Sequence, residues 1–332
     1  MGAPLKHITR PARPRPRPAA TVKAARTALL AALLAAVVAC THGGATTTRG
    51  SRDGARPEPS TRANAAQSPV PNHATRPPET AAARNTAQVA HVFVALCDNV
   101  NQGIVPVPAR LGDGDAPATN LYWGAGFGVK TFFKKSKDWR LVAESRNPRA
   151  GVLERLVFRH RTRDAYLVAD AYRGSEIKAC TLDFLDASAG APGETLDLAL
   201  DHSRASVHTA GSADLVAYVG HDGLMDFTLP ALPQRRDERE RDAVILACAS
   251  KQYFAPALRA TGARPLLWTT NLMAPEAYVL DAALTGWLAR ETGQQVRARA
   301  ATAYHKYQRC GLRAATNLFA TGFESRPRAE TT

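Results

Sequence analysis

The sequence lacks the short motifs that mark several common enzyme classes. It contains no CxxC pair, which argues against a thioredoxin-type redox site and against a zinc knuckle. It contains neither GxSxG nor HExxH, so serine hydrolases with a nucleophile elbow and zincin metallopeptidases have no support. No internal repeat is evident either. These absences exclude four recognisable kinds of site before any single residue is considered.

Two further motifs are incomplete. The stretch "GAGFGVKT", from Gly124 to Thr131, suggests a phosphate-binding loop, but Val129 stands where such a loop needs a glycine directly before Lys-Thr. We therefore expect its glycines to permit close helix packing or a turn. Asp113 and Asp115 could bind calcium, but the full EF-hand spacing is absent. The sequence thus predicts no metal and no cofactor.

Acidic residues are missing from the first 40 positions, which carry seven Lys or Arg. The first 90 residues hold +10 of the formal net charge of +14, so residues 91–332 are only mildly basic. Binding to nucleic acid needs basic residues clustered on the folded domain. The high isoelectric point therefore describes a leader and a linker, and no nucleic-acid partner is expected.

The apolar run from Thr27 to Ala39 is about half the length that spans a bilayer. It follows a basic segment and ends in small residues, as the apolar region of a secretory signal does. Its end, Val37-Val38-Ala39-Cys40, resembles the bacterial lipobox, which implies that Cys40 is acylated and anchors the protein to a membrane. A plain signal peptide with an incidental cysteine is the alternative, and translation could start downstream, near Val22. We expect a location in the cell envelope.

Residues 41–86 are rich in Thr, Ala, Pro and Arg and contain scarcely an aliphatic side chain. Such a segment cannot bury enough apolar area to offset its chain entropy. It is predicted to be a disordered tether. Residues 1–40 are predicted to be the signal peptide, and residues 87–332 a single α/β domain.

The domain alternates short apolar runs with amphipathic helical patterns. This alternation predicts a mostly parallel central sheet with helices on both faces. The predicted strands are 91–96, 154–161, 164–172, 213–220, 242–248 and 264–270. The predicted helices are a short one after the turn within 121–139, then 174–188, one starting near 274, 294–310 and 314–321.

Polar or reactive side chains follow several of these strands, at the edge where parallel sheets collect their chemistry. Cys97 and Asp98 end the first strand, His221 follows the run to Val219, and Cys248 ends another. Neighbouring strands lie about 4.8 Å apart. If the strands before His221 and Cys248 are neighbours, the imidazole can stabilise the thiolate, and Asp98 could orient the imidazole.

The order of these motifs is similar to that of the caspase-like cysteine peptidases, which include the gingipain, clostripain and caspase groups. In that superfamily a strand ending in His-Gly precedes a strand ending in Ala-Cys-x-Ser, on a largely parallel sheet. The resemblance spans about 91–290 and implies that Cys248 is the nucleophile and His221 the general acid or base. It also implies that the amides of Gly223 or Cys248 hold the oxyanion. This chain departs from the pattern in having Asp222 between His221 and Gly223.

Structural explanations compete with each of these assignments. Cysteine is among the most buried residue types, so Cys248 could be a core residue beside a simple Gly-rich turn. Cys97 could pair with Cys248 in a disulfide, and Asp98 could accept backbone hydrogen bonds within its own turn. Cys180 and Cys310 lie on apolar helix faces and are predicted to be core residues. The segment 102–108 is expected to cap the sheet rather than to line the mouth of the site.

Two functions from different classes remain. The first is an envelope-anchored cysteine hydrolase, a peptidase acting on a peptide or protein substrate. The second is a catalytically inactive envelope lipoprotein that serves as a binding module. A redox-active disulfide protein using Cys97 and Cys248 is a third possibility. Whether the chain is an enzyme at all is not decided by the sequence.

Overall fold

The computed structural model describes residues 84–201 and 203–324. The predicted signal peptide, Cys40 and nearly all of the predicted tether lie outside these residues. Within the described part of the chain, no helix combines the length and the apolar character needed to cross a bilayer. The described residues form an eight-stranded sheet, a separate two-stranded hairpin and six α-helices.

The central sheet is largely parallel, as predicted. Its strand order is β10-β9-β8-β7-β1-β4-β3-β2, and the five strands from β9 to β4 run parallel to one another. The strands β2, β3 and β10 join the two ends of the sheet in the antiparallel sense. The bounds are β1 (Gln88–Ala95), β2 (Trp139–Arg149), β3 (Val152–His160), β4 (Ala165–Tyr172), β7 (Leu215–Val219), β8 (Asp242–Leu246), β9 (Arg264–Thr269) and β10 (Phe319–Ala320).

Helices cover both faces of this sheet. On one face lie α3 (Ile177–Ala189) and α4 (Ser250–Thr261). On the other face α5 (Ala277–Leu288) packs on β8 and α6 (Gly293–Gln308) packs on β9. The shorter helices are α2 (Val129–Lys134), beside α5, and α7 (Leu312–Leu318), beside α6. The predicted α/β fold with helices on both faces is therefore confirmed.

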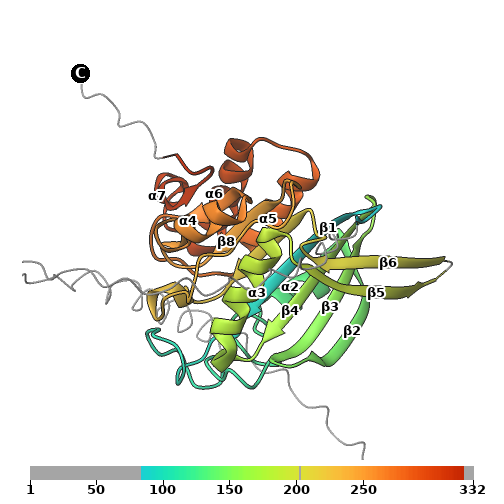
Figure 1. Cartoon of the computed structure of the whole chain (residues 1–332). Helices are drawn as coiled ribbons and strands as arrows, with labels where there is room; N and C mark the ends of the chain where they lie inside the picture. Colours follow the sequence, from blue (N-terminus) through green and yellow to red (C-terminus); the bar gives the residue numbers. More distant parts are fainter. Residues whose placement is uncertain (1–83, 202, 325–332) are drawn as a thin grey trace, which may run out of the picture. The chain divides into compact units, whose positions relative to one another are not determined.

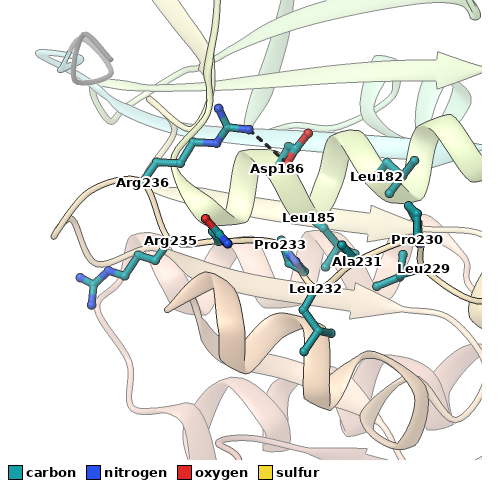
Figure 2. Close-up of a pocket in the computed structure, with 11 residues that line it drawn as sticks. Leu182, Leu185, Asp186, Leu229, Pro230, Ala231, Leu232, Pro233, Arg235 and Arg236 are labelled. Carbon is teal, nitrogen blue, oxygen red and sulfur yellow. Dashed lines mark ion pairs between the residues drawn. The ribbon is translucent and has the colours of Figure 1, made fainter. Parts of the chain in front are cut away.

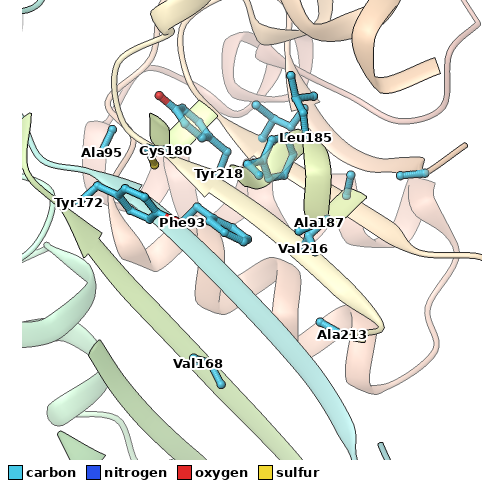
Figure 3. Packing of buried hydrophobic residues seen from close by; sticks show 14 of the residues in the cluster. Phe93, Ala95, Val168, Tyr172, Cys180, Leu185, Ala187, Ala213, Val216 and Tyr218 are labelled. Carbon is cyan, nitrogen blue, oxygen red and sulfur yellow. The ribbon is translucent and has the colours of Figure 1, made fainter. Parts of the chain in front are cut away.

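Aromatic side chains of β1 and β7 form the core beneath α3 (Figure 3). The ring of Phe184 on α3 lies 6.1 Å from that of Phe93 and 5.8 Å from that of Tyr218. Cys180 lies on the same apolar helix face and is fully buried, which confirms its predicted place in the core. Burying one such aromatic side chain stabilises the fold by about 1.5–3 kcal/mol. This packing fixes β7, and with it the position at which His221 leaves the sheet.

The hairpin of β5 (Pro192–Leu200) and β6 (Ser203–Ala210) was not predicted. It projects outward from the body of the domain (Figure 1), and much of its length is exposed. Its apolar residues Leu198 and Val207 are buried and join the core on the α3 face. The hairpin therefore takes the place of a helix over part of that face.

A buried charged network ties this hairpin to the sheet. Arg155 on β3 donates through Nε and Nη2 to Asp170 on β4, at 2.6 and 2.8 Å, and through Nη1 to Glu194 on β5 at 2.6 Å. His91 on β1 lies 3.3 Å from Asp170 and accepts a hydrogen bond from the amide of Ala210. Burial raises the pKa of Asp170, but the bonds from Arg155 and His91 outweigh it and hold that pKa well below its usual range.

Candidate active site

The strands that precede His221 and Cys248 are parallel neighbours. In the register of β7 and β8, Val219 is the partner of Leu246. His221 and Cys248 each lie two residues beyond this pair, so they leave the sheet at the same level of the same edge. Adjacent strands are about 4.8 Å apart, so the two side chains start from neighbouring positions. The structure thus fulfils the topological condition on which the predicted dyad depends.

A tight turn at the end of β7 presents His221. Gly220 has a φ of 151°, a conformation that residues with a side chain rarely adopt, and a Cβ there would lie 2.8 Å from the carbonyl oxygen of Ala95. The buried hydroxyl of Tyr218 donates a 2.7 Å hydrogen bond to the carbonyl of His221. Burial raises the pKa of Tyr218 well above 10, although a hydrogen bond from the Gly223 backbone opposes this rise. Tyr218 therefore holds the carbonyl of His221, at the start of the turn.

The imidazole of His221 contacts a carboxylate that the sequence analysis did not single out. Its Nε2 lies 2.8 Å from Oδ2 of Asp226, and the His221 side chain is only 7% exposed. A short 3₁₀ turn, η3 (Gly223–Met225), brings Asp226 back to the ring. The amide of Gly103 also donates to Oδ2 of Asp226, at 2.8 Å. Asp226 thus joins the imidazole to the loop that follows β1.

Asp222 is fully buried between His221 and this 3₁₀ turn. Its Oδ1 caps the turn by accepting a 3.0 Å hydrogen bond from the amide of Leu224. Its Oδ2 has no partner among the described residues. Burial raises the pKa of Asp222 to about 7, against the hydrogen bond from Leu224, and the charge of Asp226 raises it further. Asp222, the residue that follows His221 in the chain, is therefore a buried acid whose pKa is raised above that of an exposed aspartate.

Cys248 is half-buried at the junction of β8 and α4. Its sulfur accepts a 3.4 Å hydrogen bond from the amide of Met273, and its thiol donates a 3.6 Å hydrogen bond to the carbonyl oxygen of the same residue. Ala249 follows in the left-handed conformation, with φ 46° and ψ 28°, and α4 begins at Ser250. The sulfur therefore lies near the amino end of a 12-residue helix, where a negative charge is stabilised.

Asp98 forms a turn of its own after β1. Its Oδ1 accepts hydrogen bonds from the amides of Val100 and Asn101, and its Oδ2 accepts one from the Asn101 side chain. Asp98 thus has the turn-forming role that the sequence allowed as an alternative to orienting the imidazole. The carboxylate that contacts His221 is that of Asp226. The side chain of Gln102, the first residue of the segment 102–108, donates to the carbonyls of Leu96 and Gly174, which lie just past the ends of β1 and β4.

The other cysteines do not compete for this site. Cys97 is a buried free thiol, so the disulfide with Cys248 considered above is not formed. Burial raises the pKa of Cys97 to about 12, although a hydrogen bond with Tyr122 opposes this. Cys310 is exposed, which makes its predicted place in the core wrong. The reason is that α6 ends at Gln308 and Arg309 adopts a left-handed conformation, so Cys310 lies beyond the helix face on which it was placed.

The incomplete motifs have structural roles. Asp113 accepts a hydrogen bond from the amide of Asp115, and Asp115 in turn contacts Arg173. Within residues 84–201 and 203–324, no cluster of three or more potential metal ligands is found. A Cβ on Gly128 would lie 2.5 Å from the backbone of Trp123, so a glycine is needed where this turn meets the start of α2. The turn that we expected from these glycines is present.

A separate pocket lies along the chain that connects β7 to β8 (Figure 2). It has a volume of about 530 Å³ and is lined by α3 and by residues 229–236. Asp186 on α3 and Arg236 form an ion pair in its wall, 3.6 Å apart (Figure 2). Neither His221 nor Cys248 lines this pocket.

No family model matches the chain, and neither the curated proteins nor the solved structures include a match.

Proposed function

We propose that the protein is a cysteine hydrolase, a peptidase with a caspase-like arrangement, in which Cys248 and His221 form the dyad. The observation that carries this proposal is their equivalent position, two residues past the Val219–Leu246 pair on adjacent parallel strands. The strand order and the sequence order, histidine before cysteine, agree with the resemblance described above. Three local features support Cys248 as the nucleophile.

The first is the amide of Met273, which points a hydrogen-bond donor at the sulfur. The second is the amino end of α4, whose partial positive charge favours a thiolate. The third is the left-handed Ala249, since strained backbone next to a reactive side chain is a common feature of active sites. All three lie within two residues of Cys248 or contact it directly.

The proposed reaction has two stages. The Cys248 thiolate attacks the carbonyl carbon of the substrate, the carbon–nitrogen bond breaks, and His221 gives a proton to the leaving amine. Water then attacks the thioester, His221 accepts a proton from it, and the carbon–sulfur bond breaks. The overall result is hydrolysis of one amide bond with the enzyme regenerated.

The amide of Cys248 is the proposed donor to the oxyanion. The amide of Gly223 is the other donor that the resemblance implies, and Gly223 begins the 3₁₀ turn that follows His221 and Asp222.

The alternative function is that of a binding module, in which the protein has the same fold but catalyses no reaction. One observation favours it. Asp226 and Tyr218 hold His221 in a position that is only 7% exposed. A purely structural turn would show the same contacts. The alternative predicts no hydrolysis and no difference in reactivity between Cys248 and an ordinary exposed thiol.

Cleavage of a peptide mixture distinguishes the two functions. The full-length protein is incubated with a library of proteome-derived peptides, and new termini are identified by mass spectrometry. We expect cleavages that disappear in both Cys248→Ala and His221→Ala, while Cys310→Ala cleaves as the wild type does. Identical peptide patterns from wild type and Cys248→Ala would leave the binding module as the function.

We also propose that the protein is held at the cell envelope through a lipid on Cys40. The support is the lipobox-like end of the apolar run in the sequence. Cells fed an alkyne fatty acid should incorporate the label into the wild-type protein and not into Cys40→Ala. Equal labelling of the two proteins would contradict this anchor and would leave the hydrolase proposal intact.

A further inference from the structure

We propose that Asp226 is a positioning residue that fixes the tautomer of His221 and couples it to the loop after β1. This inference rests on the proposed function, since it assigns a third group to the same dyad. The observation that carries it is that Oδ2 of Asp226 lies 2.8 Å from Nε2 of His221 and also accepts a 2.8 Å hydrogen bond from the amide of Gly103.

The first step concerns the proton on the imidazole. An ionised carboxylate accepts hydrogen bonds and donates none, so Nε2 of His221 must carry the proton that faces Asp226. In the neutral ring the unprotonated nitrogen is then Nδ1. Only an unprotonated nitrogen can take the proton of the Cys248 thiol, so Asp226 selects Nδ1 as the basic atom of the dyad.

The second step concerns orientation. His221 follows a glycine and precedes a 3₁₀ turn, so it lies outside the regular hydrogen bonding of β7. Tyr218 holds its carbonyl and Asp226 holds its ring, which together fix the residue at both ends. Removing the carboxylate would leave the main chain in place and release only the ring.

The third step concerns the loop. Gly103 is exposed, and a Cβ on it would lie 2.3 Å from Oδ1 of Asp226. Gly103→Ala therefore displaces the carboxylate without changing any charge. Because the Gly103 amide and the imidazole share one oxygen of Asp226, a shift of this loop is passed directly to His221. Movement of the loop on binding a substrate would then adjust the dyad.

Nitrogen-15 NMR of histidine-labelled protein tests the tautomer without any need for hydrolysis. The His221 signals are assigned by comparison with His221→Ala. We expect the Nε2–H form in the wild type, a substantial population of the Nδ1–H form in Asp226→Asn, and return of the Nε2–H form in Asp226→Glu. Asp186→Asn, which changes an exposed carboxylate on α3, is the matched control and should leave the His221 signals unchanged.

Kinetics on a peptide found by the library experiment give the second measurement. We expect Asp226→Asn to lower kcat by about 10- to 100-fold with KM within about twofold, because the wrong tautomer cannot accept the thiol proton. Gly103→Ala should lower kcat by less, and Asp226→Glu should restore part of it.

The outcomes separate the two proposals. A His221 tautomer that is unchanged in Asp226→Asn, or a kcat within twofold of wild type, overturns the role of Asp226 while the hydrolase proposal stands. A wild-type protein with the Nε2–H tautomer but no hydrolysis overturns the hydrolase proposal, and the positioning contact remains as a structural one. Thermal unfolding followed by circular dichroism confirms that each variant is folded before either comparison is made.

Discussion

The hydroxyl of Tyr218 donates a 2.7 Å hydrogen bond to the main-chain carbonyl of His221. Tyr218 is the penultimate residue of β7 and is fully buried, whereas His221 has already left the sheet. A core residue thus determines where the candidate dyad histidine stands. This relationship explains how a glycine-rich turn, which would otherwise be free to move, can hold an imidazole in place.

Tyr218→Phe removes this bond and keeps the ring packed on Phe184 and Phe254. A typical intramolecular hydrogen bond contributes about 0.5–1.5 kcal/mol, so we expect the free energy of unfolding to fall by that amount. Urea denaturation measures it. We further expect the folded variant to hydrolyse peptides more slowly than the wild type, because the carbonyl of His221 loses its hydrogen bond. A variant with lowered stability and full activity would show that the bond does not position the dyad.

Asp222→Asn should make stability less dependent on pH. Burial raises the pKa of Asp222 in the folded protein to about 7, above that of an exposed aspartate. The folded state therefore binds more protons than the unfolded state between about pH 4 and 7, and wild-type stability should fall as pH rises through this window.

The asparagine variant carries no such charge, so we expect it to be more stable than wild type at pH 8, by about 1–3 kcal/mol, with the difference shrinking towards pH 4. Denaturation of both proteins at several pH values measures the difference. Parallel curves across this range would show that Asp222 is not a buried acid.

Ala249→Gly should relieve the strained backbone after Cys248. A left-handed conformation costs a non-glycine residue about 1 kcal/mol or more, and the greater chain entropy of glycine offsets part of this gain. We expect the variant to be as stable as wild type or up to about 1 kcal/mol more stable. The control is Ala282→Gly inside α5, which should lose about 1 kcal/mol. Equal losses in the two variants would contradict the strain at Ala249.

Asp170→Asn should disrupt the network that holds the β5–β6 hairpin. Removing one partner of a buried ion pair costs about 3–5 kcal/mol, and buried Arg155 would keep only the half-exposed Glu194 as a counter-charge. Since the folded pKa of Asp170 lies below its unfolded value, this stabilisation is present above about pH 4 and is lost as pH falls further.

The comparison variant is Glu194→Gln, which alters the half-exposed end of the same network and should cost no more than about 1 kcal/mol. If Asp170→Asn is too unstable to purify while Glu194→Gln unfolds normally, the result still agrees with a larger loss of stability in Asp170→Asn. Equal and small losses in both would mean that the network contributes little.

The fold class was predictable because the buried parallel strands are continuous apolar runs with polar residues directly after them. The same signal located His221 and Cys248. The strand β2 and the β5–β6 hairpin escaped prediction because they carry charged and exposed residues over much of their length, so no apolar run marks them. The helix α4 was also missed, although it begins two residues after Cys248.

The contacts that build the site were less predictable than its positions. Asp226 lies five residues after His221 and returns only through a 3₁₀ turn, so no helical or strand periodicity pairs them. Met273 reaches Cys248 from 25 residues away, after a strand and a helix have placed the two chains together. Asp98 was the carboxylate visible at a strand end, but its own turn satisfies it. Sequence patterns locate strand ends, whereas tertiary packing selects which side chains meet.

If Cys248 and His221 form a catalytic dyad, the Cys248 thiol should be unusually reactive, and the other cysteines of the chain serve as controls. Cys310 is an exposed thiol, whereas Cys97 and Cys180 are buried and the pKa of each is raised by burial. Full-length protein is treated with iodoacetamide at pH 6.5, and the labelled fraction of each cysteine is followed by mass spectrometry. We expect Cys248 to be alkylated at least about tenfold faster than Cys310, and His221→Ala to remove this advantage. Alkylation of Cys248 that is slower than that of Cys310, or unaffected by His221→Ala, would contradict a catalytic dyad.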